Sequence, residues 1–318
     1  MPIEMEAASE MNIAVSGPVA VGACIGLAIF YVAILYSPTF LFRLPPPDSF
    51  HVFMIRRFVC AIVSTGLSLF ASSLLLGVRS FKDMPSTLRI YGIRSDHMLQ
   101  AVGLPILLTF LPYAVSLVSK ILSMTYVWRE TSQFEEHNIP FHRGLLMRIY
   151  MFGTNILALR AYVVAPITEE LVFRACMVPL LCCGGFQRYT VIFLCPAFFS
   201  LAHLNNFLEL QYLKGYSFFR ASKVVGVQLG YTMVFGWYAA FLFMRTGNVF
   251  SPIVAHIVCN SMGLPAFPSS ESKVVTGVAF LAGFLGFSYL LFPVTNPSLY
   301  NDDVTDGCWS CHSYCRCE

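Results

Sequence analysis

Charged residues are scarce in this sequence: Asp, Glu, Lys and Arg make up 12% of its 318 residues, whereas soluble domains carry about 25%. Hydrophobic residues make up 57%, and the mean hydropathy is +0.68. Because a soluble fold could not bury so much apolar surface, the composition excludes an ordinary soluble protein. The formal net charge is only +3 and the 20 basic residues are scattered, so we expect no nucleic acid as a partner.

The N-terminus lacks the features of a cleavable signal peptide. It contains Glu4, Glu6 and Glu10 but no Lys or Arg, and the apolar run that follows, residues 14–36, is longer than the core of a signal peptide. We therefore interpret this run as the first membrane span and expect the protein to stay in the membrane.

Several hydrolase motifs are also missing. The absence of HExxH excludes the standard zinc metallopeptidase helix, and the absence of GxSxG excludes the nucleophile elbow of a serine hydrolase. No Asp lies in an apolar run, which disfavours an aspartyl dyad. Cys259 is close to His256, but a Cys in an apolar helix more often packs than attacks, so a thiol mechanism is disfavoured too.

Long hydrophobic runs, in contrast, recur along the whole sequence, and many reach the roughly 20 residues that cross a hydrocarbon core of about 30 Å. They predict an all-α fold, a polytopic transmembrane bundle of about eight helices in a single membrane-embedded domain, residues 1–318. We expect Pro166 to kink or divide the fourth run, which is too long for one helix, and Gly184 with Gly185 to end it. The runs are 14–36, 58–78, 98–124, 145–183, 189–204, 225–244, 249–264 and 274–291.

Polar segments separate these runs. We place Arg43, Arg56 and Arg57 in the first loop and residues 125–144 in the longest aqueous loop, and we expect the aromatic and basic stretch 205–223 to lie along the membrane surface. The first two loops carry similar numbers of basic residues, so the positive-inside rule does not decide the orientation.

Cysteine is plentiful, and its distribution is uneven. Seven of the 11 cysteines lie in or near apolar runs, where a free Cys behaves as a small hydrophobe, so we expect no disulfide framework. Near the C-terminus, the sequence CWSCHSYCRC has three possible interpretations. It could belong to a mobile tail, residues 296–318, with lipidated or reactive thiols. It could also form a metal-binding knuckle, or attach haem through CxxCH. We favour the mobile tail, since one CxxCH at a terminus supplies no haem pocket. The residues concerned are Cys308, Cys311, His312, Cys315 and Cys317.

Ionisable side chains inside a span are costly and usually face a bundle interior or a watery cavity. In APITEELVFRACM, Glu170 and Arg174 stand at i and i+4, so they can pair on one helix face. Glu169 points about 100° away from Glu170 and lacks that cation, which leaves it free to act as a base. The structural alternative is that Thr168 caps a helix after Pro166 and both carboxylates satisfy the helix dipole.

Two further clusters add histidines to apolar segments. Phe199 and His203 stand at i and i+4 in FFSLAHLNN, and so do His256 and Asn260 in SPIVAHIVCN. Taken singly, each could be a packed side chain or a link between helices. Taken together, a carboxylate, two imidazoles and an amide form a set of base, proton carrier and oxyanion donors.

At these residues the sequence resembles the CAAX prenyl protease 2 family, the Ras-converting endopeptidases of the ABI group of membrane glutamic peptidases. The family pattern is EExxxR, then FxxxH, then HxxxN or HxxxB. The resemblance is strong over about residues 160–268, which contain the catalytic motifs, and weaker in the N-terminal spans. The pattern is matched in order by Glu169, Glu170 and Arg174, then Phe199 and His203, then His256 and Asn260.

The resemblance implies a peptidase of the endoplasmic reticulum membrane that removes the aaX tripeptide from prenylated CaaX proteins, such as Ras-like small GTPases, after the prenyl-Cys. It implies that Glu169 and His203 activate water and that His256 and Asn260 bind the oxyanion. Glu170, Arg174 and Phe199 would support them.

The sequence implies no cofactor, although one carboxylate and two histidines could hold zinc. Two other functions stay open. One is a transporter or scaffold without catalytic activity, in which the same Glu and His residues form a proton relay. The other is an ABI-type peptidase with a different membrane-bound substrate.

Overall fold

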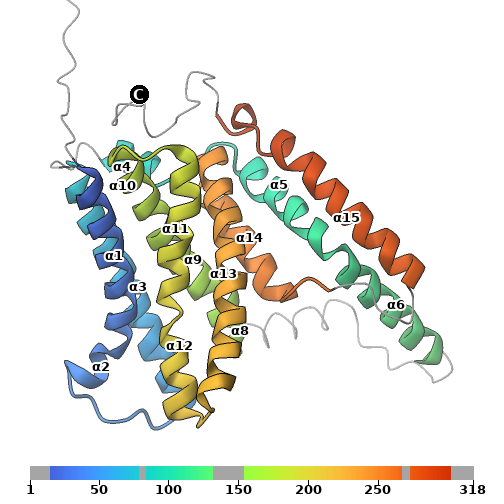
Figure 1. Ribbon diagram of the computed structural model, residues 1–318, viewed down its shortest axis with the longest axis horizontal. Helices are drawn as coiled ribbons and strands as arrows, with labels where there is room; N and C mark the ends of the chain where they lie inside the picture. The colour runs from blue at the N-terminus through green and yellow to red at the C-terminus, as the bar shows by residue number, and fades with distance from the viewer. Residues whose placement is uncertain (1–14, 79–83, 132–153, 267–272, 302–318) are drawn as a thin grey trace, which may run out of the picture.

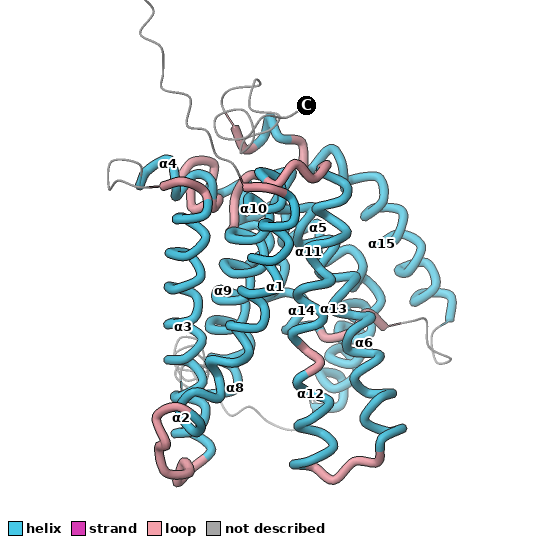
Figure 2. The backbone as a smooth tube through the Cα atoms, turned by 60° about the vertical axis from the view of Figure 1, so that its left-hand side comes forward, coloured by secondary structure: helices cyan, strands magenta, loops and turns pink. Residues whose placement is uncertain are grey.

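The computed structural model describes residues 15–78, 84–131, 154–266 and 273–301. These residues form helices joined by short loops, and no strand occurs among them. Figure 1 and Figure 2 show the helices running roughly along one direction in a bundle. The predicted all-α fold is therefore confirmed.

The first two spans form a helical pair. Helix α1 (Gly17–Ala33) continues through the short turns η1 (Ile34–Tyr36) and α2 (Ser37–Phe40), and α3 (Phe50–Leu75) follows. Placing Arg56 and Arg57 in a loop was wrong, because both lie inside α3. A long Arg side chain near a helix end can extend its charged group out of the apolar layer, and Arg56 Nη1 donates to the carbonyl of Pro45 at 2.7 Å.

The third span follows a short surface helix, α4 (Met84–Ile90). It consists of α5 (Met98–Phe110), the 3-10 turn η3 (Leu111–Tyr113) and α6 (Ala114–Thr131). Its apolar part, Met98–Met124, has the predicted bounds. Helix α6 then runs on to Thr131, into the segment assigned to an aqueous loop, and the rest of that loop lies outside the described residues.

The fourth run is helical without interruption from Ile156 to Cys183. It consists of α8 (Ile156–Leu159), η4 (Arg160–Val164), α9 (Ala165–Glu170), η5 (Leu171–Cys176) and α10 (Met177–Cys183), and η4 and η5 are π-helical. Pro166 does not divide the run, because it follows the wider π turn at the start of α9, where its missing N–H is tolerated. Gly184 ends α10 as predicted.

The remaining helices complete the bundle. Helix α13 begins at Phe218, capped by the Ser217 hydroxyl, so residues 218–223 belong to a span and not to a surface segment. The elements are α11 (Arg188–Ala202), α12 (Asn205–Leu208), η6 (Glu209–Leu213), α13 (Phe218–Thr246), α14 (Phe250–Met262), α15 (Lys273–Val294) and η8 (Pro297–Leu299).

Among the described residues, five helices are long and apolar enough to cross a membrane, and α11 and α14 are shorter apolar helices. Together with the segmented helix Ile156–Cys183, they correspond to the eight predicted runs. Helices α5, α6 and α15 form an arm that leans away from the other helices in Figure 1. The protein is a multi-pass membrane protein.

The core of the bundle surrounds α10, in which Met177 to Cys182 are all buried. Two neighbouring spans, α11 and α13, approach closely where Gly236 faces Pro196. A Cβ atom at Gly236 would stand 2.6 Å from the Pro196 Cβ, so the packing at this crossing depends on the absence of a side chain. This crossing holds α11, which carries Phe199 and His203, against α13.

Most apolar cysteines pack as expected. Six described cysteines are free and buried, whereas Cys183 is disulfide-bonded, which was not expected. The four C-terminal cysteines lie outside the described residues. The six free cysteines are Cys24, Cys60, Cys176, Cys182, Cys195 and Cys259.

The first residues of the C-terminal segment, 296–301, pack against the bundle. Tyr300 is buried, and the Arg94 guanidinium donates to the side chain of Asn301 at 2.5 Å and to the carbonyl of Tyr300 at 3.1 Å. The same guanidinium pairs with Asp96, and this hydrogen bond holds the pKa of Asp96 below its ordinary value. Arg94 therefore fastens the end of the described chain to the loop before α5.

Candidate active site

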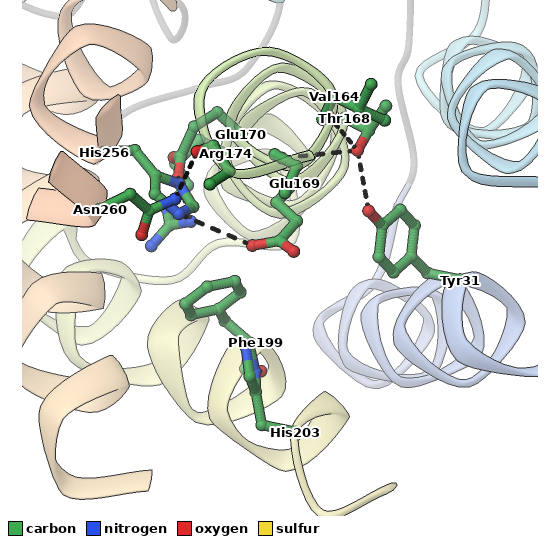
Figure 3. Close-up of polar contacts among 12 residues, drawn as sticks. Tyr31, Val164, Thr168, Glu169, Glu170, Arg174, Phe199, His203, His256 and Asn260 are labelled. Atoms are coloured by element: carbon green, nitrogen blue, oxygen red, sulfur yellow. Dashed lines mark hydrogen bonds and ion pairs between the residues drawn. The ribbon is translucent and has the colours of Figure 1, made fainter. Parts of the chain in front are cut away.

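Three helices bring the predicted site residues together: α9 carries the two glutamates, α11 carries Phe199 and His203, and α14 carries His256 and Asn260. Figure 3 shows these side chains around one region of the bundle interior, with Tyr31 of α1 facing them. Both glutamates stand on α9, a short α-helical segment between two π-helical ones. Such π-helical interruptions are frequent at functional sites.

Glu170 is the centre of a buried charged group. Its Oε1 atom accepts hydrogen bonds from Arg174 Nη1 at 3.0 Å and from His256 Nδ1 at 2.8 Å. The side chains of Glu170 and Arg174 are both 0% exposed. The predicted i,i+4 pair is therefore present, and it also holds the imidazole of His256, which the sequence did not indicate.

Glu169 differs from its neighbour in both contacts and exposure. Its side chain is 19% exposed, and its Oε2 atom lies 3.9 Å from His256 Nε2. Figure 3 shows this carboxylate on a different side of α9 from Glu170, as predicted from the helical angle, with a dashed line to His256. Glu169 thus has access to a reactant that the buried Glu170 lacks.

Thr168 does not cap a helix, so that structural alternative is wrong. Helix α9 begins at Ala165, and the Thr168 hydroxyl donates to the carbonyl of Val164 one turn back at 2.7 Å. The same hydroxyl lies 2.8 Å from the Tyr31 hydroxyl. Thr168 therefore joins α9 to α1 beside Glu169.

His203 stands at the C-terminal end of α11. Its Nδ1 atom lies 2.9 Å from the carbonyl oxygen of Phe199. Because a carbonyl only accepts, Nδ1 carries the proton, and in the neutral ring Nε2 is left as a proton acceptor. Within the described residues, no hydrogen bond or ion pair joins His203 to Glu169 or His256, and Figure 3 shows Phe199 between His203 and those two residues.

The Phe199 ring lies in contact with both histidines. Its centroid is 4.8 Å from that of His203 and 6.4 Å from that of His256, and the Arg174 guanidinium lies over it at 4.6 Å. The ring of Phe235 on α13 was missed, although its centroid lies 4.8 Å from that of His256. In a chain with 29 Phe residues, no signal in the sequence marks this one.

Asn260 lies at the exposed end of the site. Its Nδ2 atom donates to the carbonyl of Ala161 in η4 at 2.7 Å. One N–H of the amide therefore ties α14 to the π-helical turn before α9, and the other N–H is available to a ligand.

A zinc site with three protein ligands does not fit this arrangement. In the described part of the chain, no three His, Cys, Asp or Glu side chains gather in a way that could hold a metal ion. One nitrogen of each histidine is already hydrogen-bonded: Nδ1 of His256 to the Glu170 carboxylate, and Nδ1 of His203 to the Phe199 carbonyl.

Comparisons with known proteins agree with these motifs. The family of type II CAAX prenyl endopeptidases described as Rce1-like matches residues 152–262. CAAX prenyl protease 2 of Arabidopsis thaliana is 47% identical over 300 residues, covering 93% of this chain and 96% of the relative. The human protein of the same name is 33% identical over 288 residues, covering 89% of this chain and 83% of the relative. No solved structure matches the chain.

The matched family region contains every residue of the three motifs, from Glu169 to Asn260. The Arabidopsis relative extends the similarity to nearly the whole chain. The chain therefore belongs to the CAAX prenyl protease 2 family of membrane endopeptidases.

Proposed function

We propose that this protein hydrolyses the peptide bond after the prenylated Cys of CaaX proteins, Ras-like small GTPases among them, and releases the aaX tripeptide. The observation that carries the proposal is the pair of carboxylates around His256. Glu170 holds its Nδ1 atom at 2.8 Å, while the more exposed Glu169 lies 3.9 Å from its Nε2 atom. One carboxylate fixes the imidazole, and the other is free to take a proton.

Glu169 acts as the general base. It removes a proton from water, and the hydroxide that forms attacks the carbonyl carbon of the scissile bond. His203 holds this water through Nε2, because its Nδ1–H is occupied by the Phe199 carbonyl. When the intermediate collapses, the proton passes to the leaving amine, so Glu169 returns to its ionised form.

His256 and Asn260 stabilise the oxyanion. A doubly protonated His256 donates Nδ1–H to Glu170 and has Nε2–H left for the oxyanion, and Asn260 offers its second amide N–H. Donors that are already fixed in place need no reorganisation at the moment when the negative charge develops. The two residues stand one turn apart on α14 and therefore present their donors on one face of that helix.

Glu170 and Arg174 are positioning residues. The buried Arg174 compensates the charge of Glu170, and Glu170 in turn sets the ring orientation of His256. Phe199 supports this group by accepting the Arg174 guanidinium over its ring face. Together they keep a charged pair stable inside an apolar bundle.

The single membrane-embedded domain suits a lipidated substrate. A prenyl chain partitions into the bilayer, so the substrate arrives at the depth of the site already oriented. We place the enzyme in the endoplasmic reticulum membrane, with the substrate peptide approaching from the cytosol. Localisation of the tagged full-length chain against markers of that membrane tests this placement.

The experiment that tests the activity compares two peptides with the same CaaX sequence, one farnesylated and one not. Membranes containing this protein should release aaX only from the farnesylated peptide. If neither peptide is cut while a proton flux depends on Glu169, the protein is a transporter with a Glu and His relay. Cleavage of other membrane-bound peptides alone would indicate an ABI-type peptidase with a different substrate.

A further inference from the structure

We propose that the groove between α1 and α11 binds the prenyl chain of the substrate. This inference rests on the proposed function and adds a binding site for the lipid part of the substrate. The groove has a volume of about 460 Å³ and opens between the two helices. It is lined by Ile25, Ala28, Ile29, Val32 and Ala33 of α1 and, from the other side, by Phe198, Leu201, Ala202 and Leu204.

All nine lining residues are apolar. An isoprenoid chain has no hydrogen-bonding groups, so an apolar groove satisfies it without leaving a polar atom unpaired. Ile29 and Leu201 are 63% and 57% exposed at the surface of the bundle, which leaves the groove open to the lipid side. A chain dissolved in the bilayer can therefore enter sideways.

One end of the groove lies beside the site, near His203. Ala202 and Leu204 stand on either side of His203, and Phe198 precedes Phe199. On the opposite wall, Val32 follows Tyr31, whose hydroxyl lies 2.8 Å from that of Thr168. Figure 3 shows Tyr31 on α1 across from Phe199 and His203, with the Glu169 carboxylate pointing toward the space between them.

The length of the groove also fits a chain that enters from one leaflet. Residues 25–33 of α1 span about 12 Å at 1.5 Å per residue, close to half of a hydrocarbon core of about 30 Å. In Figure 1, α2 and α12 mark the end of the bundle to which α1 and α11 both run. A prenyl-Cys held beside His203 would therefore direct its chain from that end toward the middle of the membrane.

A second apolar groove is larger, about 1020 Å³, and lies between α1, α2 and α3. Its lining comes only from Phe30 to Leu44 and from Ile55 to Leu67, segments that carry no candidate catalytic residue. Size alone favours this groove, but a prenyl chain must be attached to the residue next to the scissile bond. Proximity to His203 therefore favours the groove between α1 and α11.

Photo-crosslinking tests the assignment without requiring turnover. The probe is a farnesylated CaaX peptide that carries a diazirine on its last isoprene unit, and it is irradiated with the full-length protein. Adducts are expected within residues 25–33 and 198–204, and an excess of unlabelled farnesylated peptide should reduce them at least about tenfold, as for a saturable site. Adducts on residues 55–67, or labelling that the competitor does not reduce, would overturn the proposal.

Steady-state kinetics provide a second test. Val32→Trp and Ala202→Trp fill the groove from opposite walls, and each should raise KM for the farnesylated peptide about tenfold with little change in kcat, because the prenyl chain is bound equally in the ground and transition states. Val19→Trp adds the same side chain to an exposed position of α1 outside the groove and serves as the control.

An unchanged KM in both groove variants would refute the assignment while leaving the peptidase function intact. If the wild-type protein cuts no farnesylated peptide, the proposed function fails instead. The crosslinking pattern then still decides whether the groove binds the lipid.

Discussion

The Nδ1 atom of His256 lies 2.8 Å from the Oε1 atom of Glu170, although 86 positions separate the two residues in the sequence. This hydrogen bond joins α14 to α9 inside the bundle. Since Glu170 also accepts from Arg174, the orientation of one imidazole depends on a buried ion pair. We therefore expect stability and catalysis to be coupled at this point.

Substitutions at Glu170 and Arg174 separate these two effects. Glu170→Gln leaves the buried Arg174 charge uncompensated, and we expect it to destabilise the protein by about 3 kcal/mol. It should also lower kcat at least about 100-fold, since His256 loses the carboxylate that orients its ring and stabilises its charged form. The double variant Glu170→Gln with Arg174→Met removes the unpaired charge, so thermal unfolding should recover while kcat stays low. Recovery of kcat together with stability would show that Glu170 has only a structural role.

Removing the Glu169 carboxylate should slow turnover strongly without unfolding the protein. Glu169→Ala is expected to lower kcat by about 10² to 10⁴, the range typical of general-base catalysis. Glu209→Ala makes the same change outside the site, in η6, and should leave the rate of aaX release unchanged. His203→Ala should resemble Glu169→Ala, and His51→Ala at an exposed position of α3 is its control. Full activity in Glu169→Ala and His203→Ala would remove both residues from the mechanism.

The oxyanion donors should affect kcat much more than KM, because the oxyanion exists only after attack. We expect Asn260→Ala and His256→Ala each to lower kcat about 10² to 10³, as observed when one such donor is removed. Ser261→Ala alters the next residue of α14, whose hydroxyl donates to Val258 within the same helix, and should be neutral. A rise in KM with unchanged kcat would assign Asn260 to substrate binding instead.

Chelation tests the role of metal. Since no three suitable side chains gather among the described residues, we expect aaX release to persist after the purified protein is treated with a strong chelator and dialysed. Metal content is measured on the same sample. Loss of activity that added zinc restores would show that a metal takes part.

The crossing of α11 and α13 should not tolerate a side chain at Gly236. Gly236→Ala places a methyl group against Pro196, and overpacking of this kind costs about 1 to 3 kcal/mol. Gly226→Ala, on the same helix with open space around it, should be neutral or slightly stabilising, since Ala favours a helix by roughly 1 kcal/mol over Gly. Equal melting temperatures for the two variants would contradict the close approach.

Much of the fold and part of the site could be predicted from the sequence, because they depend on local spacing. The lengths of the apolar runs predicted where the membrane spans lie. The i,i+4 spacing predicted that Glu170 pairs with Arg174 and that Phe199 lies next to His203. The same rule directed Glu169 away from that pair. Each of these relations is contained in a single helix, where geometry is fixed by residue number.

Contacts between helices could not be predicted in this way. Periodicity gives the face on which a side chain lies but not the partner opposite, so neither the bond from His256 to Glu170 nor the ring contact with Phe235 was predicted. The start of the second span was also predicted wrongly, at residue 58, whereas α3 begins at Phe50. A hydropathy run ends at a charged residue such as Arg57, but the backbone of the helix continues through it. The roles of the catalytic residues stay predictions until the variants are measured.

The π-helical turns before and after α9 determine how this helix would respond to the loss of a residue. A π turn contains one more residue than an α turn, so deleting a single residue between Leu171 and Cys176 would let η5 close into a regular helix. The segments on either side would keep nearly the same angular relation, because a π turn absorbs its extra residue within one turn. A deletion inside α9 itself would instead turn one side of the helix by about 100° relative to the other. The residue count of α9 is therefore a stricter requirement of this site than the residue count of the π turns that flank it.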